Sequence, residues 1–204
     1  MERAHLAIAA AATVAASWFI FVWLRDQQAA PAELPEPDES TDTTTDDAEA
    51  SIADNIMQTV RQTLQLWRPP VKYAGMVASA EAAYDIPSDM LARLLYQECR
   101  WREDVITGRT TSPVGALGIA QFMPATAREM GINPLDPEQA IPAAARYLKS
   151  LYGRFGTWAQ ALAAYNWGQG NVARKGLTLA PAETRNYYTQ ILADVNAANG
   201  TTYA

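Results

Sequence analysis

Residues 91–101, LARLLYQECRW, place a carboxylate at the end of an apolar helix face. Three leucines lie seven, four and three residues before Glu98, so at helical spacing the four side chains share one stripe. Such a stripe faces a core, where lost hydration disfavours the charged form of a carboxylate and raises its pKa. We therefore predict that Glu98 is a buried acid able to donate and retake a proton. The alternative is a helix-end glutamate that bends out to water.

The chain from residue 52 onward carries further helical patterns and few strand signals. Apolar residues recur at spacings of three and four up to Trp67, before two prolines. Capping pairs are expected at Asp136 with Gln139 and at Thr157 with Gln160, and Gly200 is expected to end the last helix. Helices are predicted over 52–67, 71–84, from residue 89 through Glu98, 124–131, 136–152, from Thr157, and 183–198. The pattern predicts a mainly α-helical domain over residues 56–204.

Composition excludes several kinds of catalytic site. The 204-residue chain has one histidine, His5, and one cysteine, Cys99. A Ser-His-Asp or Cys-His nucleophile and a histidine-rich zinc site all need an imidazole, and none follows residue 5. We therefore expect no metal site and no cofactor, and carboxylates must carry any acid–base chemistry.

The charge of the chain divides by region. Residues 26–55 hold ten Asp or Glu and no Lys or Arg, whereas residues 56–204 hold fourteen basic and eleven acidic residues. The formal net charge of −6 therefore comes from the segment 26–55. The mildly basic remainder suits an anionic polymer, but three excess charges are a weak signal and no nucleic-acid partner is predicted.

The N-terminal region predicts a membrane anchor and a tether. Residues 6–24 form a run of nineteen uncharged residues with aromatic rings near its end, long enough to span a bilayer. We expect a transmembrane helix within 1–25, with a cleaved signal peptide as the alternative because Ala30-Pro31-Ala32 imitates a cleavage site. Residues 26–55 are rich in Pro, Thr, Asp and Glu, which predicts a disordered acidic linker.

Four separated segments carry a family resemblance: YQECRW around Glu98, SPVGALGIAQFMPATA over 112–127, LAAYNWGQGNV over 162–172, and ETRNYY over 183–188. Their order, spacing and content resemble lytic transglycosylases of the soluble lytic transglycosylase type, relatives of goose-type lysozyme. The resemblance covers roughly residues 71–195. It implies a lysozyme-like helical fold with a cleft that binds peptidoglycan glycan strands.

The resemblance also implies roles for individual residues. Glu98 occupies the catalytic position, and Tyr165 is expected to form a hydrogen bond near it. Packing in the core is the alternative for Met123 and Tyr165, and a helix-dipole contact is a further reading of Glu183. Gly115 and Gly118 either let the backbone approach a ligand or form a turn. The residues implied to contact substrate are Ser112, Gln121, Met123, Tyr165, Asn166, Glu183 and Tyr187.

The chain departs from the family pattern at two places. Cys99 stands where serine is common, and its thiol is a weaker hydrogen-bond donor. The connection 102–111, REDVITGRTT, is also longer than in relatives and brings two more carboxylates, Glu103 and Asp104, near the catalytic position in sequence.

The implied reaction needs one acid. Protonated Glu98 would cleave the bond between N-acetylmuramic acid and N-acetylglucosamine, and closure by the sugar's own 6-hydroxyl would leave a 1,6-anhydro end. A hydrolytic muramidase that positions water with Glu103, Asp104 or Glu183 is one alternative, and a non-catalytic glycan-binding or assembly subunit is another. We expect the domain on the peptidoglycan side of a membrane, serving an envelope machine or a phage virion.

Overall fold

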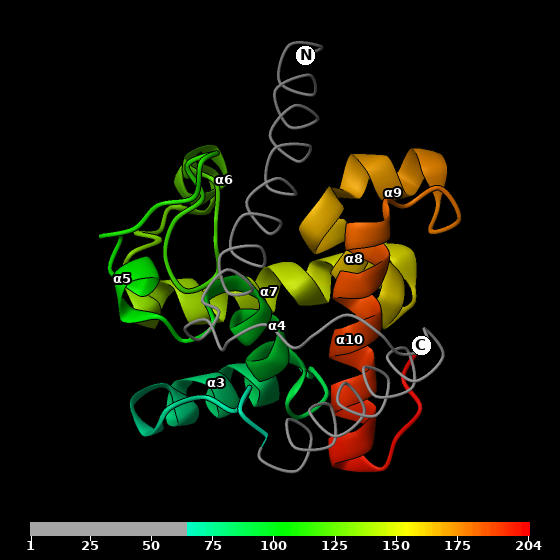
Figure 1. The fold of residues 1–204 in the computed structure, drawn as a ribbon, viewed down its shortest axis with the longest axis horizontal. Helices are drawn as coiled ribbons and strands as arrows, with labels where there is room; N and C mark the ends of the chain where they lie inside the picture. The colour runs from blue at the N-terminus through cyan, green and yellow to red at the C-terminus, as the bar shows by residue number, and fades with distance from the viewer. Residues whose placement is uncertain (1–64) are drawn as a thin grey trace, which may run out of the picture.

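The computed structural model describes residues 65–204 (Figure 1). The anchor predicted for 1–25, the linker predicted for 26–55 and all but the last turn of the helix predicted for 52–67 lie outside the described residues. Trp67 itself lies in a turn. Within 65–204 no helix combines the length and the apolar character needed to cross a membrane.

The described part of the chain is mainly α-helical, which confirms that part of the predicted fold class. Its only β pairing is an isolated antiparallel bridge between Leu117 and Phe122. Two short helices, α5 and α9, were not predicted, and α7 continues three residues beyond the predicted Tyr152. The helices are α3 Val71–Ala83, α4 Met90–Cys99, α5 Glu103–Ile106, α6 Pro124–Met130, α7 Pro137–Phe155, α8 Trp158–Trp167, α9 Gln169–Lys175 and α10 Ala182–Asn199.

The predicted helix caps are present, with one difference. Asp136 accepts a hydrogen bond from the Glu138 N–H at 3.0 Å, and Thr157 accepts one from the Gln160 N–H at 3.2 Å. Gln139 donates to the Asp136 side chain at 2.7 Å, but its oxygen accepts from the Asn133 N–H instead of the Asp136 N–H. The capping pair at α7 therefore also ties down the preceding loop.

Helix α8 is the centre of the core. Four consecutive residues in it, 161–164, are fully buried and three of them are alanines. Small side chains let neighbouring helices approach closely, and α8 packs against α7, α9 and α10 (Figure 1).

Helix α4 lies against α3 on one side and α10 on another (Figure 1). Nine of its ten residues are buried, so the helix is enclosed along nearly its whole length. This placement brings the C-terminal end of α4, where Glu98 lies, against the first turns of α10.

Candidate active site

Glu98 lies in the last turn of α4 and is 8% exposed, while the three leucines of its stripe are fully buried. Burial raises the pKa of its carboxyl from 4.5 to about 8, because the charged form loses hydration. The Tyr187 hydroxyl donates to Glu98 Oε1 at 2.6 Å and lowers the pKa in part. The predicted burial is confirmed, and Glu98 is protonated at neutral pH; its catalytic role stays a prediction.

The chain directly after Glu98 is held in an uncommon backbone conformation. Arg100 and Trp101 both have positive φ, 51° and 54°. Such non-glycine residues persist only where the surroundings fix them. Here the Trp101 indole donates to the Trp67 carbonyl at 2.9 Å and its ring stacks on Tyr73 with centroids 6.1 Å apart. The chain directly after the acid is therefore anchored to Trp67 and to Tyr73 of α3.

Helix α10 is locked to α4 by a second polar contact. The Arg93 guanidinium donates to Asp194 at 2.6 Å and to the Gln97 side chain at 2.6 Å. Arg93 is 4% exposed, so this ion pair is shielded from water on its α4 side. Together with the Tyr187 bond to Glu98, it fixes α4 and α10 relative to each other at two points along their contact.

Tyr165, at the end of α8, does not donate to Glu98. Its hydroxyl donates to the Ala120 carbonyl at 3.0 Å, so the direct donor to the acid is Tyr187 from α10. Tyr165 is still close enough for the Glu98 charge to help raise the pKa of its hydroxyl, although burial is the larger cause. Tyr165 therefore forms its hydrogen bond to the backbone beside the acid, and its part in the reaction stays a prediction.

The Tyr165 ring packs in an aromatic cluster that sequence reasoning missed. Its centroid lies 5.5 Å from that of Tyr147 and 6.2 Å from that of Phe122. Tyr147 follows Ala143 and Ala144 at helical spacing on the buried face of α7, and that spacing was the available signal. The cluster fixes Tyr165 between α7 and the loop that precedes α6.

The loop 112–123 contributes three predicted site residues, each with a different role in the structure. Ser112 is buried, and its hydroxyl accepts from the Ala116 N–H at 2.6 Å, which closes a turn. Gln121 has φ 49°, and its amide nitrogen donates to the Gly118 carbonyl at 2.7 Å. Its Oε1 is buried with no hydrogen-bond partner in the described part of the chain. Met123 is half-buried and precedes α6.

The glycines of this loop serve the fold. A Cβ at Gly118 would lie 1.8 Å from the Pro134 carbonyl oxygen, so the close approach is to the protein's own backbone. Gly115 has φ 80° in a turn, and nothing lies near its missing side chain. Gly118 is therefore required by packing within the fold, whereas Gly115 fits a turn and leaves open space beside the backbone.

Asn166 and Glu183 lie where α8 meets the start of α10. The Thr184 hydroxyl donates to Asn166 Oδ1 at 2.9 Å, so Asn166 joins the two helices. Glu183 is half-buried, and desolvation raises the pKa of its carboxyl to about 7. A helix dipole would lower that pKa, so burial is the larger influence here. Glu183 Oε1 has no partner among the described residues.

The two other carboxylates near Glu98 in sequence are ionised and held by neighbouring side chains. Glu103 is exposed and bonds to Lys72 and to the Tyr73 hydroxyl, and the Lys72 bond is the largest cause of its lowered pKa. Asp104 accepts from Arg102 at 2.6 Å and from Thr110 at 2.7 Å, which lowers its pKa to about 2. Groups of such low pKa are poor proton acceptors at neutral pH.

Cys99 is buried beside the acid, and burial raises the pKa of its thiol to about 12, so it stays protonated. Among the described residues no three His, Cys, Asp or Glu side chains group as metal ligands. The predicted site residues therefore include one protonated carboxyl, on Glu98, that is bonded to the Tyr187 hydroxyl, and two unpartnered buried oxygens, on Gln121 and Glu183.

Comparison of the sequence with known proteins identifies relatives of this chain. The family described as Transglycosylase SLT domain matches residues 75–187. Membrane-bound lytic murein transglycosylase F 2 of Alkalilimnicola ehrlichii is 37% identical over 50% of this chain and 23% of its own length. The transglycosylase of Enterobacteria phage PRD1 is 34% identical over 61% of this chain and 43% of its own.

A third relative is the peptidoglycan transglycosylase gp16 of Escherichia phage T7, which is 33% identical over 60% of this chain and 10% of its own length. The chain thus spans less than half the length of each of these relatives. No solved structure matches the chain.

Proposed function

The chain belongs to the transglycosylase SLT domain family, and we propose that it is a peptidoglycan lytic transglycosylase. It would cleave the β-1,4 bond between N-acetylmuramic acid and N-acetylglucosamine and leave a 1,6-anhydromuramic acid end. The observation that carries this proposal is the burial of Glu98, which keeps its carboxyl protonated at neutral pH. A general acid must hold its proton until the leaving oxygen needs it.

The proposed reaction uses Glu98 twice. Its carboxyl donates a proton to the glycosidic oxygen as the bond to the anomeric carbon breaks, and the substrate's acetamido group holds the positive centre. Ionised Glu98 then removes the proton of the muramic 6-hydroxyl, whose oxygen bonds to the anomeric carbon. The carboxyl ends protonated as it began, and no water is consumed.

Tyr187 supports the second half of this cycle. Its hydroxyl already donates to Glu98 at 2.6 Å, and a donor to a carboxylate stabilises the charged form. The bond is made within the fold, so it is in place before substrate arrives. We assign Tyr187 this role in addition to the substrate contact that the family resemblance implies.

The remaining predicted residues have proposed roles that follow from their partners. The unpartnered oxygens of Gln121 and Glu183 would accept from sugar hydroxyl or amide groups. Met123 would offer an apolar contact. Ser112, Asn166 and Tyr165 use their polar groups within the fold and would shape the site around the substrate.

A hydrolytic muramidase is the second candidate, and Glu183 is the observation in its favour. A carboxyl with a pKa of about 7 is suited to take a proton from water. Glu103 and Asp104 are not suited, because their pKa values are lowered by the side chains that bind them. A non-catalytic glycan-binding subunit has no need for the protonated acid at position 98.

Product analysis separates the two enzymatic candidates. Purified peptidoglycan is digested with the full chain in oxygen-18 water, and the muropeptides are weighed before and after borohydride treatment. A lytic transglycosylase gives products one water lighter than those of a hydrolase, with no reducible muramic end. Reducible ends that carry the heavy oxygen would show hydrolysis and end the proposal, even with Glu98 essential.

We also propose that residues 1–25 anchor the protein in a membrane, with the domain on the peptidoglycan side. The nineteen uncharged residues support an anchor, and relatives are named both as membrane-bound enzymes and as phage enzymes. Local wall opening by an envelope machine or a phage virion fits either setting. A mature N-terminus near Glu33, or release of the protein by alkaline wash, would contradict the anchor.

A further inference from the structure

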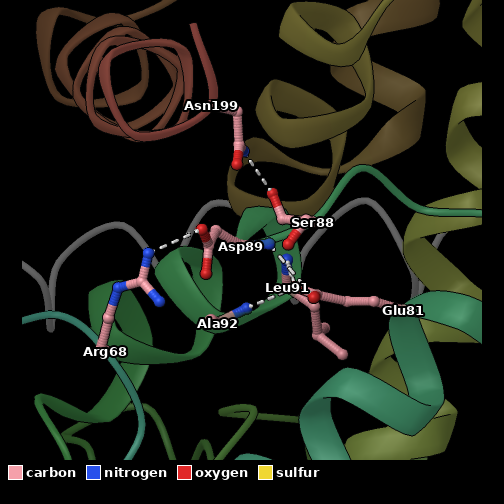
Figure 2. Close-up of polar contacts among 7 residues, drawn as sticks. All are labelled: Arg68, Glu81, Ser88, Asp89, Leu91, Ala92 and Asn199. Carbon is pink, nitrogen blue, oxygen red and sulfur yellow. Dashed lines mark hydrogen bonds and ion pairs between the residues drawn. The ribbon is translucent and has the colours of Figure 1, made fainter.

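The N-terminus of α4 is capped by a side chain from another helix. Glu81, in the last turns of α3, accepts backbone N–H bonds from Leu91 at 2.9 Å, Ala92 at 3.2 Å and Asp89 at 3.1 Å (Figure 2). Both of its oxygens take part. Figure 2 shows the carboxylate reaching across from α3 to the first turn of α4.

Neither a local side chain nor water replaces this cap. Asp89, the residue at the N-cap position, has φ 69° and forms no side-chain cap, because its carboxylate instead meets Arg68 at 3.3 Å. Leu91 is fully buried and Ala92 is 2% exposed, so their N–H groups have no path to solvent. Buried N–H groups without an acceptor are costly, and Glu81 supplies the acceptor for both.

We propose that Glu81 is a positioning residue for the catalytic acid: by capping α4, it seats the helix against α3 and sets where Glu98 is held at the other end. Leu91 and Glu98 are seven residues apart, about 10 Å along a helix axis. A short hydrogen-bonded helix moves as one body, so a shift at the capped end reaches the acid.

The surroundings of α4 leave this role to Glu81. Contacts with α10, through Arg93 to Asp194 and through Glu98 to Tyr187, hold the side and the far end of α4, and Asn199 of α10 donates to the Ser88 carbonyl at 2.8 Å just before the helix without capping it (Figure 2). Within the described residues, Glu81 is the only side chain of α3 that accepts hydrogen bonds from backbone N–H groups at the start of α4. Loss of this cap would free the first turn and loosen the geometry in which Tyr187 meets Glu98.

The carboxylate is ionised when it acts as the cap. Burial and the nearby charge of Asp89 raise the pKa of Glu81 to about 6, against the lowering influence of its three N–H donors. Arg68 pairs with Asp89 at 3.3 Å. At neutral pH both Glu81 oxygens therefore remain acceptors.

The test compares Glu81→Gln with Asp136→Ala in the full chain. Glutamine keeps the shape of Glu81 but replaces one acceptor oxygen by an NH2 group that faces N–H donors. Asp136→Ala removes a helix cap of the same kind from α7, which does not carry the acid. Turnover of a soluble glycan oligomer is measured at a temperature at which both variants are fully folded.

We expect Glu81→Gln to lower kcat at least about tenfold, since small misplacement of a catalytic group is costly. KM should stay within about twofold, because the substrate contacts do not change. Asp136→Ala should leave both constants within about twofold of the parent protein. Equal losses of kcat in the two variants would mean that Glu81 serves stability alone. If Glu81→Gln does not fold, Glu81→Asp, which keeps the charge on a shorter arm, takes its place.

This inference rests on the proposed function, so the test includes a second readout that does not depend on activity. Carbon-13 NMR of the Glu98 carboxyl gives its pKa in each variant. Glu81→Gln should move that pKa toward its ordinary value of 4.5 as the loosened helix admits water, while Asp136→Ala should not. An inactive parent protein would end the proposed function but leave this test standing. An unchanged Glu98 pKa in Glu81→Gln would overturn the positioning role.

Discussion

Helix α4 has a buried carboxyl group at each end, and the two groups differ in their hydrogen-bond donors. Glu81 and Glu98 are 7% and 8% exposed, and loss of hydration is the largest influence on the pKa of both carboxyls. Three backbone N–H groups donate to Glu81, whereas Glu98 accepts one bond from the Tyr187 hydroxyl. The pKa is about 6 for Glu81 and about 8 for Glu98.

This difference shows how one residue type takes two roles at the two ends of α4, from α3 at one end and from α4 itself at the other. Donors stabilise the charged form of a carboxylate and oppose the effect of burial. Glu81 is therefore ionised at neutral pH and serves as an acceptor, while Glu98 keeps its proton and can donate it. The three donors at Glu81 and the more complete loss of hydration at Glu98 together distinguish the structural carboxylate from the acid.

Removal of the ionisable proton at the C-terminal end of α4 should have the largest effect. Glu98→Gln keeps the shape and can still accept from Tyr187, but it cannot transfer a proton. We expect release of muropeptides to fall at least about 100-fold with the fold retained by circular dichroism. Glu103→Gln and Asp104→Asn are the matched controls and should stay within about tenfold of the parent. Near-normal turnover in Glu98→Gln together with its loss in Glu103→Gln would place the acid elsewhere.

The ion pair between Arg93 of α4 and Asp194 of α10 can be tested separately from the contacts at the two ends of α4. Arg93→Met leaves Asp194 without its cation. We expect the free energy of unfolding, measured by urea titration, to drop by about 2 kcal/mol. This value is lower than for a fully buried pair, because the Asp194 side chain is 20% exposed. The double variant with Asp194→Leu should recover part of that loss. If the single variant were as stable as the parent, the ion pair would not hold α4 against α10.

The donor at Glu98 can be removed without touching the acid. Tyr187→Phe deletes the hydroxyl that lowers the Glu98 pKa, so that pKa should rise and the loss of activity at alkaline pH should move to higher pH. Turnover at the optimum should fall about tenfold, because a bond to a charged group is lost in the second half of the cycle. A profile displaced toward lower pH would mean that the tyrosine does not stabilise the ionised form.

The raised pKa of Glu98 should also make the free energy of unfolding depend on pH. Its folded pKa of about 8 lies above the ordinary 4.5, so the native state holds a proton that the unfolded state releases between these values. Stability therefore falls as pH rises from about 4.5 to about 8. Glu98→Gln should make that slope shallower by about 1.4 kcal/mol per pH unit. Urea titrations at pH 5 and pH 8 give the free energy of unfolding of both proteins. An equal change between the two pH values in the parent protein and in Glu98→Gln would indicate an ordinary Glu98 pKa.

Sequence reasoning predicted the apolar stripe of Glu98 but not what binds the acid. Tyr187 lies 89 residues further along the chain, so only the packing of α10 on α4 brings its hydroxyl to Glu98. The same stripe pattern, with Tyr73 and Val77 eight and four residues before Glu81, marks a second buried carboxylate. Residue pattern alone cannot tell these two apart, because their donors come from other elements.

The fold was predictable where helices are long and capped, and less so elsewhere. α7 and α10 have clear caps and stops in the sequence, such as Asp136 and Gly200. α5 has four residues and α9 has seven, and such short helices depend on tertiary packing. α6 also has seven residues but was predicted, because Pro124 and Gly131 mark its two ends. Gly118 indicated a close backbone approach, but the approaching group was the Pro134 carbonyl.

Carbon-13 NMR titration of both carboxyl groups in the unmodified protein tests this account most directly. Glutamate is labelled at the carboxyl carbon, and Glu81→Gln and Glu98→Gln serve to identify the two signals. Glu81 should titrate near pH 6 and Glu98 near pH 8, so that Glu98 is still protonated when Glu81 is charged. A Glu98 titration at or below that of Glu81 would contradict it, because the acid would then have lost its proton at neutral pH.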